Sequence, residues 1–100
     1  MPYYKKYYKP QVMAWIKHFR DGKQPKTVQE AVHYYAVKCA IHDTLQMDDG
    51  VDRMRLIEMC YLKKRKSIIG AAMEVGVSER TAYNWCSDFA KIVEEKAGYV

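Results

Sequence analysis

Residues 78–87 contain polar side chains of the kinds that recognise base pairs in DNA. If this stretch is a helix, Arg80 and Asn84 lie one turn apart on the same face. A guanidinium can donate two hydrogen bonds to O6 and N7 of guanine, and a carboxamide can pair with N6 and N7 of adenine. We therefore predict that the outward residues of this helix contact bases: Ser78, Glu79, Arg80, Tyr83, Asn84 and Ser87.

The stretch SIIGAAMEVGVSERTAYNWC, residues 67–86, has the pattern of two short helices joined by a tight turn. Ser67 and Ser78 are each suited to cap the start of a helix, and Gly76 permits the positive φ of a sharp turn. Helix-turn-helix units present the first turns of their second helix to the major groove. The pattern predicts such a unit, although an exposed Arg and Asn are ordinary surface residues on most helices.

The chain carries a formal net charge of +5, and that charge is unevenly distributed. Residues 27–62 contain six acidic and three basic side chains, whereas the block KKRK at residues 63–66 directly precedes the expected pair of helices. Such a distribution favours a polyanionic partner. We predict phosphate contacts from these residues: Lys63, Lys64, Arg65, Lys66, Ser67, Thr81 and Lys91. A structural role competes with this interpretation, because cations at the C-terminal end of a helix also stabilise its dipole.

The chain begins with MPYYKKYYK, in which two tyrosine pairs are each followed by lysine, three lysines in all. Lys5, Lys6 and Lys9 are candidates to neutralise phosphates along the backbone or in a minor groove. The tyrosines can instead stack on unpaired bases. The plain alternative is that tyrosines pack on the helical core while the lysines are solvated.

Helical periodicity recurs along the chain, and no stretch has the alternating pattern of a β-strand. A first helix is expected to begin at Pro10 and to end before Asp21-Gly22. Thr27 and Glu30 match a capping box, which predicts the start of a second helix. Three further helices are expected at about residues 51–64, between Ser67 and Gly76, and over residues 78–97. The sequence thus predicts an all-α fold of about five helices.

The chain is expected to form one compact domain, in line with its 100 residues. Residues 1–50 comprise the basic arm and a helical core segment that is also a candidate for oligomerisation, and residues 51–100 comprise the helix-turn-helix region. The second helix has one apolar stripe made of Val28, Ala31, Val32, Tyr35 and Cys39, and another made of Val37, Ile41 and Leu45. A helix that is apolar on two sides is either central or part of a subunit interface.

The same periodicity predicts the buried faces of the other long helices. The first helix is expected to bury Val12, Met13, Trp15, Ile16 and Phe19. The third is expected to direct Met54, Ile57 and Tyr61 inward, flanked by Leu56 and Cys60. The fifth is expected to bury Ala82, Trp85, Phe89, Ile92 and Val93.

From Arg53 onward, the segments RMRLIEMCYL and IIGAAMEVGVSERTAYNW resemble sigma-factor region 4-like helix-turn-helix domains. The likeness is closer to small phage-encoded transcriptional regulators of the RinA/ArpU type and covers the last 48 residues. It implies an activator of late phage genes for packaging, morphogenesis or lysis. It also places on the recognition helix the residues Ser78, Glu79, Arg80, Thr81, Tyr83 and Asn84. The basic block at residues 63–66 departs from many sigma-like domains, which have a short Gly-containing turn there.

Other classes of function find little support in the sequence. No apolar run approaches the roughly 18 residues that a membrane span needs, and the first residues lack the apolar core of a signal peptide. Three widely spaced cysteines fit reduced thiols in the cytoplasm, with Cys39 and Cys60 interpreted as small core residues. Cys39 and His42 have a metal-like spacing but no second ligand pair. We expect no metal, no cofactor and no enzymatic activity, and helix capping accounts for Asp48, Asp49 and Asp52.

The combined interpretation is a protein that binds duplex DNA in a sequence-specific manner and regulates transcription of late phage genes inside a bacterial cell. RNA polymerase is a candidate partner, and a homodimer would place two recognition helices about 34 Å apart. One alternative is a small terminase subunit, which recognises viral DNA for packaging and assembles as a ring. Another is an adaptor that binds RNA polymerase without reading DNA.

Overall fold

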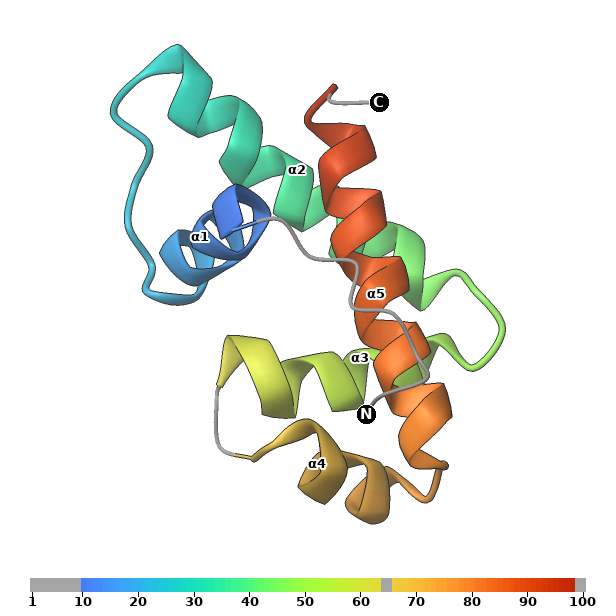
Figure 1. Cartoon of the computed structure of the whole chain (residues 1–100). Coiled ribbons are helices and arrows are strands. Elements are labelled where there is room, and N and C mark those ends of the chain that lie inside the picture. The colour runs from blue at the N-terminus through green and yellow to red at the C-terminus, as the bar shows by residue number, and fades with distance from the viewer. Residues whose placement is uncertain (1–9, 64–65, 99–100) are drawn as a thin grey trace.

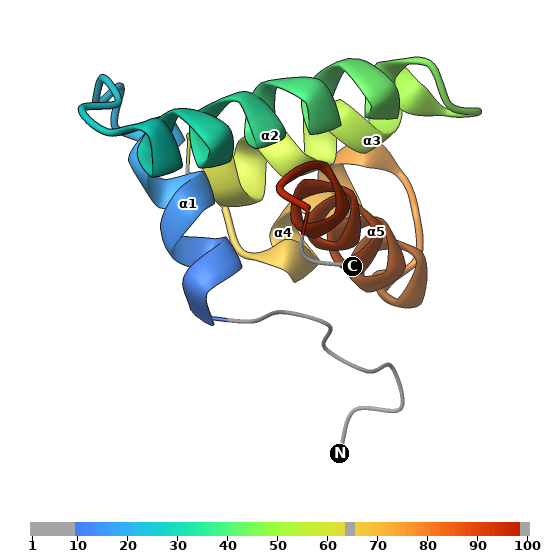
Figure 2. The ribbon, with the colours of Figure 1, turned by 90° about the horizontal axis from the view of Figure 1, so that it is seen from above.

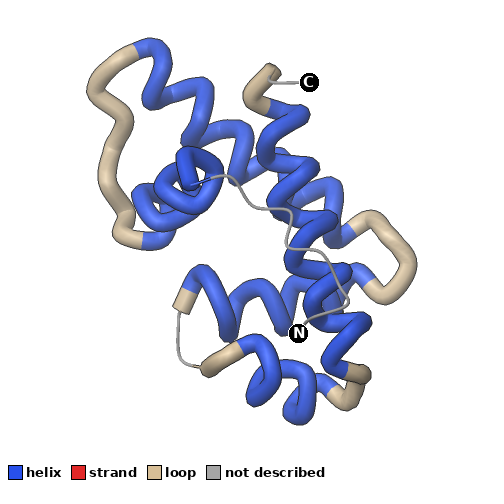
Figure 3. Tube along the Cα trace, in the orientation of Figure 1, coloured by secondary structure: helices blue, strands red, loops and turns tan. Residues whose placement is uncertain are grey.

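The computed structural model describes residues 10–63 and 66–98, and these residues form helices and turns without any β-strand (Figure 3). In chain order the elements are α1 (Pro10–Arg20), α2 (Val28–Leu45), α3 (Gly50–Ile57), the π-helix η1 (Glu58–Leu62), α4 (Ile68–Val75) and α5 (Glu79–Lys96). The expected all-α fold with five α-helices is therefore confirmed. None of the helices described here is both long enough and apolar enough to cross a bilayer.

The two longest helices, α2 and α5, make the most extensive helix–helix contact in the molecule. Figure 2 shows α2 lying across α5, which is seen nearly end-on beneath it. The helix α1 packs on α2 and η1, and α3 packs on α2, α4 and α5 (Figure 1). Because α2 contacts α1, α3 and α5, it is a central helix of the fold.

Buried side chains from all six elements form one core. The largest fully buried side chains are Phe89, Ile16, Leu56, Ile57, Val12, Val37, Val93 and Cys86. The inward faces predicted for α1 and α5 are confirmed, with Met13, Phe19 and Ile92 only partly buried. On α5 the core also takes in Cys86 and Ala90, which follow Ala82 at intervals of four residues and were not among the predicted residues, and Glu94 is buried beside them.

Hydroxyl side chains begin three of the helices, as predicted. The hydroxyl oxygens accept backbone N–H bonds at 3.0 Å (Thr27 from Glu30), 3.1 Å (Ser67 from Gly70) and 3.1 Å (Ser78 from Thr81). The reciprocal half of the capping box differs from expectation, because the Glu30 carboxylate accepts from the N–H of Lys26 at 2.7 Å. The carboxylate therefore ties the preceding linker to α2.

The turn between α2 and α3 depends on backbone geometry, and the aspartates there do not cap α3. Asp49 precedes the helix with a φ of 59°, and its side chain makes no cap hydrogen bond. A capping side chain requires extended backbone at that position, so the left-handed conformation explains why the prediction was wrong. At Gly50 an added Cβ would lie 2.5 Å from the carbonyl oxygen of Leu45. Only glycine lets α3 begin this close to the end of α2.

The first of the two apolar stripes of α2 is largely on the surface. Val28 is 83% exposed, Tyr35 is 56% exposed, and Val32 and Cys39 are exposed as well. The interpretation of Cys39 as a core residue is therefore wrong. The residues that α2 buries are instead Ala36, Val37, Ala40 and Thr44. Small side chains on this face allow the neighbouring helices to approach closely, which leaves the larger apolar residues outside.

The third predicted helix ends earlier and turns differently than expected. After Ile57 the chain continues as a π-helix, in which the N–H of Lys63 donates to the carbonyl of Glu58 at 2.7 Å. The buried residues of this segment are Leu56 and Ile57 at the end of α3 and Cys60 in η1, so the inward position predicted for Ile57 is confirmed. Met54 and Tyr61, which were also expected to point inward, are only partly buried.

Candidate nucleic-acid interface

A three-residue turn separates α4 from α5, and Gly76 begins it with a φ of 90°. The carbonyl oxygen of Ala72 accepts two hydrogen bonds there, from the N–H of Gly76 at 2.8 Å and of Val77 at 3.0 Å. This left-handed cap satisfies the end of α4 and redirects the chain. Ala72 on α4 and Ala82 on α5 are both fully buried, so small side chains line the crossing of the two helices.

Arg80 and Asn84 lie on the outward face of α5, one turn apart, and both are exposed. Neither side chain forms a hydrogen bond or an ion pair with another residue of the described part of the chain. Glu79 is also exposed, whereas Tyr83 and Ser87 are half-buried. The donors that the base-contact prediction requires are therefore accessible on the first two turns of α5.

Ser78 and Thr81 already have structural partners. The hydroxyl of Ser78 accepts from the backbone N–H of Thr81 and donates to the Thr81 hydroxyl oxygen at 2.9 Å. Contact of either hydroxyl with DNA would compete with this cap. Glu79 lies in the first turn of α5, where a carboxylate stabilises the positive end of the helix dipole.

Arg53 of α3 holds the middle of α5 in place. Its Nη1 donates to Asp88 Oδ2 at 3.2 Å, and its Nε donates to the carbonyl of Asp48 at 3.2 Å. Its guanidinium also lies over the ring of Trp85, 5.3 Å from the centroid. These contacts join α3, the turn before it and α5. Sequence reasoning missed this bridge, because no local pattern connects residues 35 positions apart.

The basic block is only partly within the described residues. Lys63 and Lys66 are exposed, and the Lys66 ammonium lies 3.1 Å from the Glu74 carboxylate. A cavity of about 250 Å³ beside them is also lined by Arg55, Glu58 and Met59. Lys66 therefore has an acidic partner on α4, which reduces the positive charge it offers to a phosphate. Lys64 and Arg65 lie outside the described residues, as do three lysines of the arm, Lys5, Lys6 and Lys9.

Two further residues predicted to contact phosphates lie outside the basic block, one at the start of α4 and one on α5. Ser67 is exposed, but its hydroxyl already accepts the N–H of Gly70. Lys91 is exposed on α5, two turns beyond Asn84. The structure thus brings Arg80, Asn84 and Lys91 onto one helix and places the described part of the basic block next to α4.

The candidate metal ligands and the cysteines lie apart from this surface in the described part of the chain. Within residues 10–63 and 66–98, no three His, Cys, Asp or Glu side chains come together as metal ligands. Cys60 and Cys86 are both buried, and a hydrogen bond between them lowers the pKa of the Cys60 thiol against the opposing effect of burial.

Comparisons of the chain with protein-family models, with curated proteins and with solved structures gave no match. The resemblance to phage regulators therefore remains an inference from the residues that carry it, 53–62 and 68–85.

Proposed function

We propose that the protein binds duplex DNA in a sequence-specific manner, with the first two turns of α5 in the major groove. The observation that carries this proposal is the accessible pair of Arg80 and Asn84, whose donors are not used by other described residues. The cap at Ser78 and the turn at Gly76 support it, because they fix the start of α5 relative to α4. A net charge of +5 supports a polyanionic partner.

The biological role that we propose is regulation of late phage genes inside a bacterial host cell. This part of the proposal rests on the resemblance of residues 53–62 and 68–85 to RinA/ArpU-type regulators. The phosphates would be contacted by the basic block and Lys91, with Lys66 exchanging Glu74 for DNA. Lys5, Lys6 and Lys9 are proposed to add contacts along the backbone.

Selection of bound duplexes from a random pool at fixed salt tests this function directly. If a preferred site emerges, Arg80→Ala should weaken binding by about 1–3 kcal/mol at one base pair and relax the preference there. Lys66→Ala should weaken binding to all sequences alike and flatten the dependence on salt. Lys17, an exposed lysine on α1, provides the matched control, because its replacement should change neither property. An Arg80→Ala protein that discriminates as the parent does would refute the assignment.

A second copy of the chain is the partner that we propose for α2. Its outer side carries Val28, Val32 and Tyr35, hereafter the α2 stripe, at spacings of four and three residues. Two α2 stripes paired about a two-fold axis would cover one another, and a dimer can bind two half-sites about 34 Å apart. Val32→Asp should then yield a monomer by light scattering. A ring of higher mass would instead favour a small terminase subunit.

An adaptor that binds RNA polymerase is the second candidate function, and one observation favours it. On α4, Met73 is 78% exposed and Ile69 is 48% exposed, one turn apart. Adjacent exposed apolar side chains are suited to contact another protein. If the protein is only an adaptor, replacing both Arg80 and Asn84 with Ala leaves transcription activation intact, whereas Met73→Asp abolishes it.

A further inference from the structure

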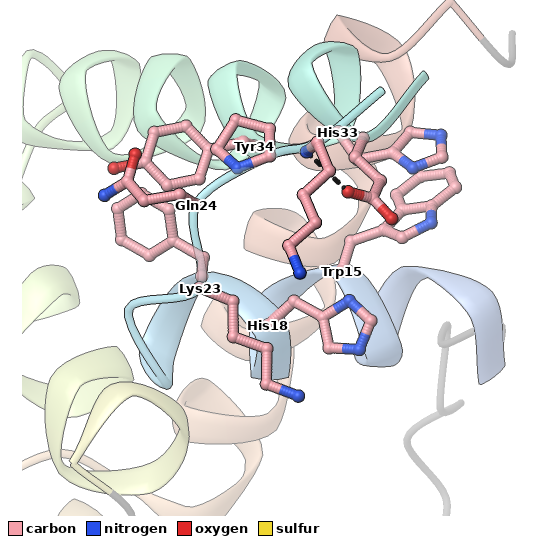
Figure 4. A pocket seen from close by; sticks show the side chains of 10 residues that line it. Trp15, His18, Lys23, Gln24, His33 and Tyr34 are labelled. Carbon is pink, nitrogen blue, oxygen red and sulfur yellow. Dashed lines mark hydrogen bonds between the residues drawn. The ribbon is translucent and has the colours of Figure 1, made fainter. Parts of the chain in front are cut away.

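A second candidate site lies far from Arg80 and Asn84 in the sequence, at the junction of α1 and α2. It is a cavity of about 230 Å³ between the second half of α1, the linker of residues 23–26 and the first turns of α2 (Figure 4). None of the residues that line it belongs to α4 or α5. Its volume lies below the range of about 300–1,000 Å³ for drug-sized ligands, so it suits a single small ring system.

Five of the ten residues that line this cavity carry aromatic rings: Trp15, His18, Phe19, His33 and Tyr34. The rings of Trp15 and His33 stack at 3.8 Å between centroids with an interplanar angle of 17°. The rings of Phe19 and Tyr34 meet at 5.0 Å and 46°. In Figure 4 the Trp15–His33 pair and Tyr34 lie on opposite sides of the opening. Ring systems on two sides favour a flat, aromatic occupant.

The charged side chains around the opening are mainly cationic. Lys23 and Lys26, both in the linker that follows α1, supply two cations, and Figure 4 shows the His18 imidazole of α1 on the same side of the opening as Lys23. The single carboxylate, that of Glu30, already accepts the backbone N–H of Lys26 at 2.7 Å. Burial lowers the pKa of His33, so its imidazole is neutral near pH 7 and contributes a ring rather than a charge.

We propose that this cavity binds a nucleotide, with the base between the aromatic walls and the phosphate at Lys23 and Lys26. A flat ring that carries negative charge satisfies both the apolar walls and the cationic rim. The amide of Gln24 at the opening can hydrogen-bond the edge of the base. The same chemistry is offered by a free mononucleotide and by an unpaired nucleotide at the 5′ end of a strand. This inference is independent of the function proposed for α5.

Titration of the full chain with 5′-AMP, followed by ¹⁵N NMR, tests the site. We expect saturable shifts of the Trp15 indole N–H and of backbone amides in residues 18–34. Adenosine and ribose 5-phosphate should each bind at least tenfold more weakly than 5′-AMP, because adenosine lacks the phosphate and ribose 5-phosphate lacks the base. The double variant Lys23→Ala/Lys26→Ala should lose at least tenfold in affinity, and the matched control Lys17→Ala should stay within twofold.

A 5′-phosphorylated oligodeoxyadenylate and its 5′-hydroxyl counterpart form the second arm of the experiment. Saturation by 5′-AMP assigns the cavity to free nucleotides, and saturation by the phosphorylated strand alone assigns it to a strand end. If neither ligand shifts these signals at millimolar concentration, or if the double lysine variant binds as the parent does, the proposal is wrong. Arg80→Ala should leave the AMP affinity unchanged, and a loss there would place the binding elsewhere. Failure of duplex binding by α5 would not affect this outcome.

Discussion

The helices α2 and α5 are each 18 residues long, yet they divide apolar and polar surface in different ways. On α5, large side chains such as Trp85 and Phe89 are covered by the rest of the chain, and the outer face is polar. On α2, the covered face consists mostly of small residues, and the α2 stripe is exposed. The difference teaches that the large apolar side chains of α5 are covered within the folded chain, which leaves that helix a polar outer surface. The helix α2 retains exposed apolar area, which is the kind of surface that protein partners cover.

Truncating one aromatic residue on each helix tests most directly whether α5 is more fully packed than α2. Phe89 is 1% exposed, so Phe89→Ala should lower the free energy of unfolding by about 3–5 kcal/mol through lost burial and a cavity. Tyr35→Ala should change the free energy of unfolding of the monomer by less than about 0.5 kcal/mol. Urea denaturation at low protein concentration measures both values. Equal losses would mean that α2 is as fully packed as α5.

A substitution at Gly76 tests whether the start of α5 depends on the turn itself. A Cβ at this position meets no atom within 4 Å, so the cost of a side chain comes from the φ of 90°. Gly76→Val should lower the free energy of unfolding by about 1–2 kcal/mol, because a β-branched residue disfavours left-handed backbone. Gly76→Asn provides the control and should cost less, since asparagine tolerates this conformation. Thermal denaturation that ranks the two variants equally would contradict the assigned turn.

The bridge from Arg53 tests how α5 is held from the side. Arg53→Ala should lower the free energy of unfolding by about 1 kcal/mol, because it removes one partly exposed ion pair and the contact with Trp85. Arg53→Lys keeps the charge without the planar guanidinium and should recover only part of the loss. A double-mutant cycle with Asp88→Ala isolates the ion pair. Additive effects would show that the two side chains do not interact.

The smallest expected effect concerns pH and the ion pair between α2 and α5. The Lys96 ammonium lies 2.9 Å from Asp43 and, through this hydrogen bond, lowers the pKa of the Asp43 carboxyl. A lowered pKa in the folded state means that the stabilisation is present above the ordinary carboxyl range near 3.9. It is lost as the pH falls through the lower folded value. Asp43→Asn should therefore be slightly less stable than the parent at pH 7 and equally stable near pH 2. A constant difference across this range would exclude the ion pair as its cause.

Local patterns predicted the features of the fold that depend on neighbouring residues. The caps at Thr27, Ser67 and Ser78, and the turn at Gly76, each involve atoms within five residues of one another. The outward position of Arg80 was also predictable, because helical periodicity separates it from the buried face of α5. These features share a cause, which is that hydrogen bonding and steric limits of a short segment determine them.

Features that depend on distant contacts escaped prediction. Periodicity showed that α2 has two apolar sides, but it does not tell which side the chain covers. The side of α2 that packs against the other helices is the one with the small residues Ala36 and Ala40, because these side chains allow neighbouring helices to approach α2 closely. The Arg53–Asp88 bridge joins α3 to α5, and the Lys66–Glu74 pair joins the segment before α4 to the last turn of α4, so neither has a signature in the helical periodicity. The position of the candidate site on α5 was therefore predictable from the sequence. The contacts that position α5 and its neighbours, such as Arg53–Asp88, were not.

The π-helical turn at η1 bears on how α4 and α5 are oriented. Its hydrogen bond spans five residues, so the turn contains one residue more than an ordinary α-helical turn. One residue of α-helix corresponds to a rotation of about 100° and a rise of about 1.5 Å. The extra residue is accommodated within the π-helical turn. It changes the direction of the chain at the end of η1 relative to that of a continuous α-helix. The end of η1 is therefore rotated relative to α3 by one residue more than a continuous α-helix would give, and α4 and α5 follow this turn in the chain.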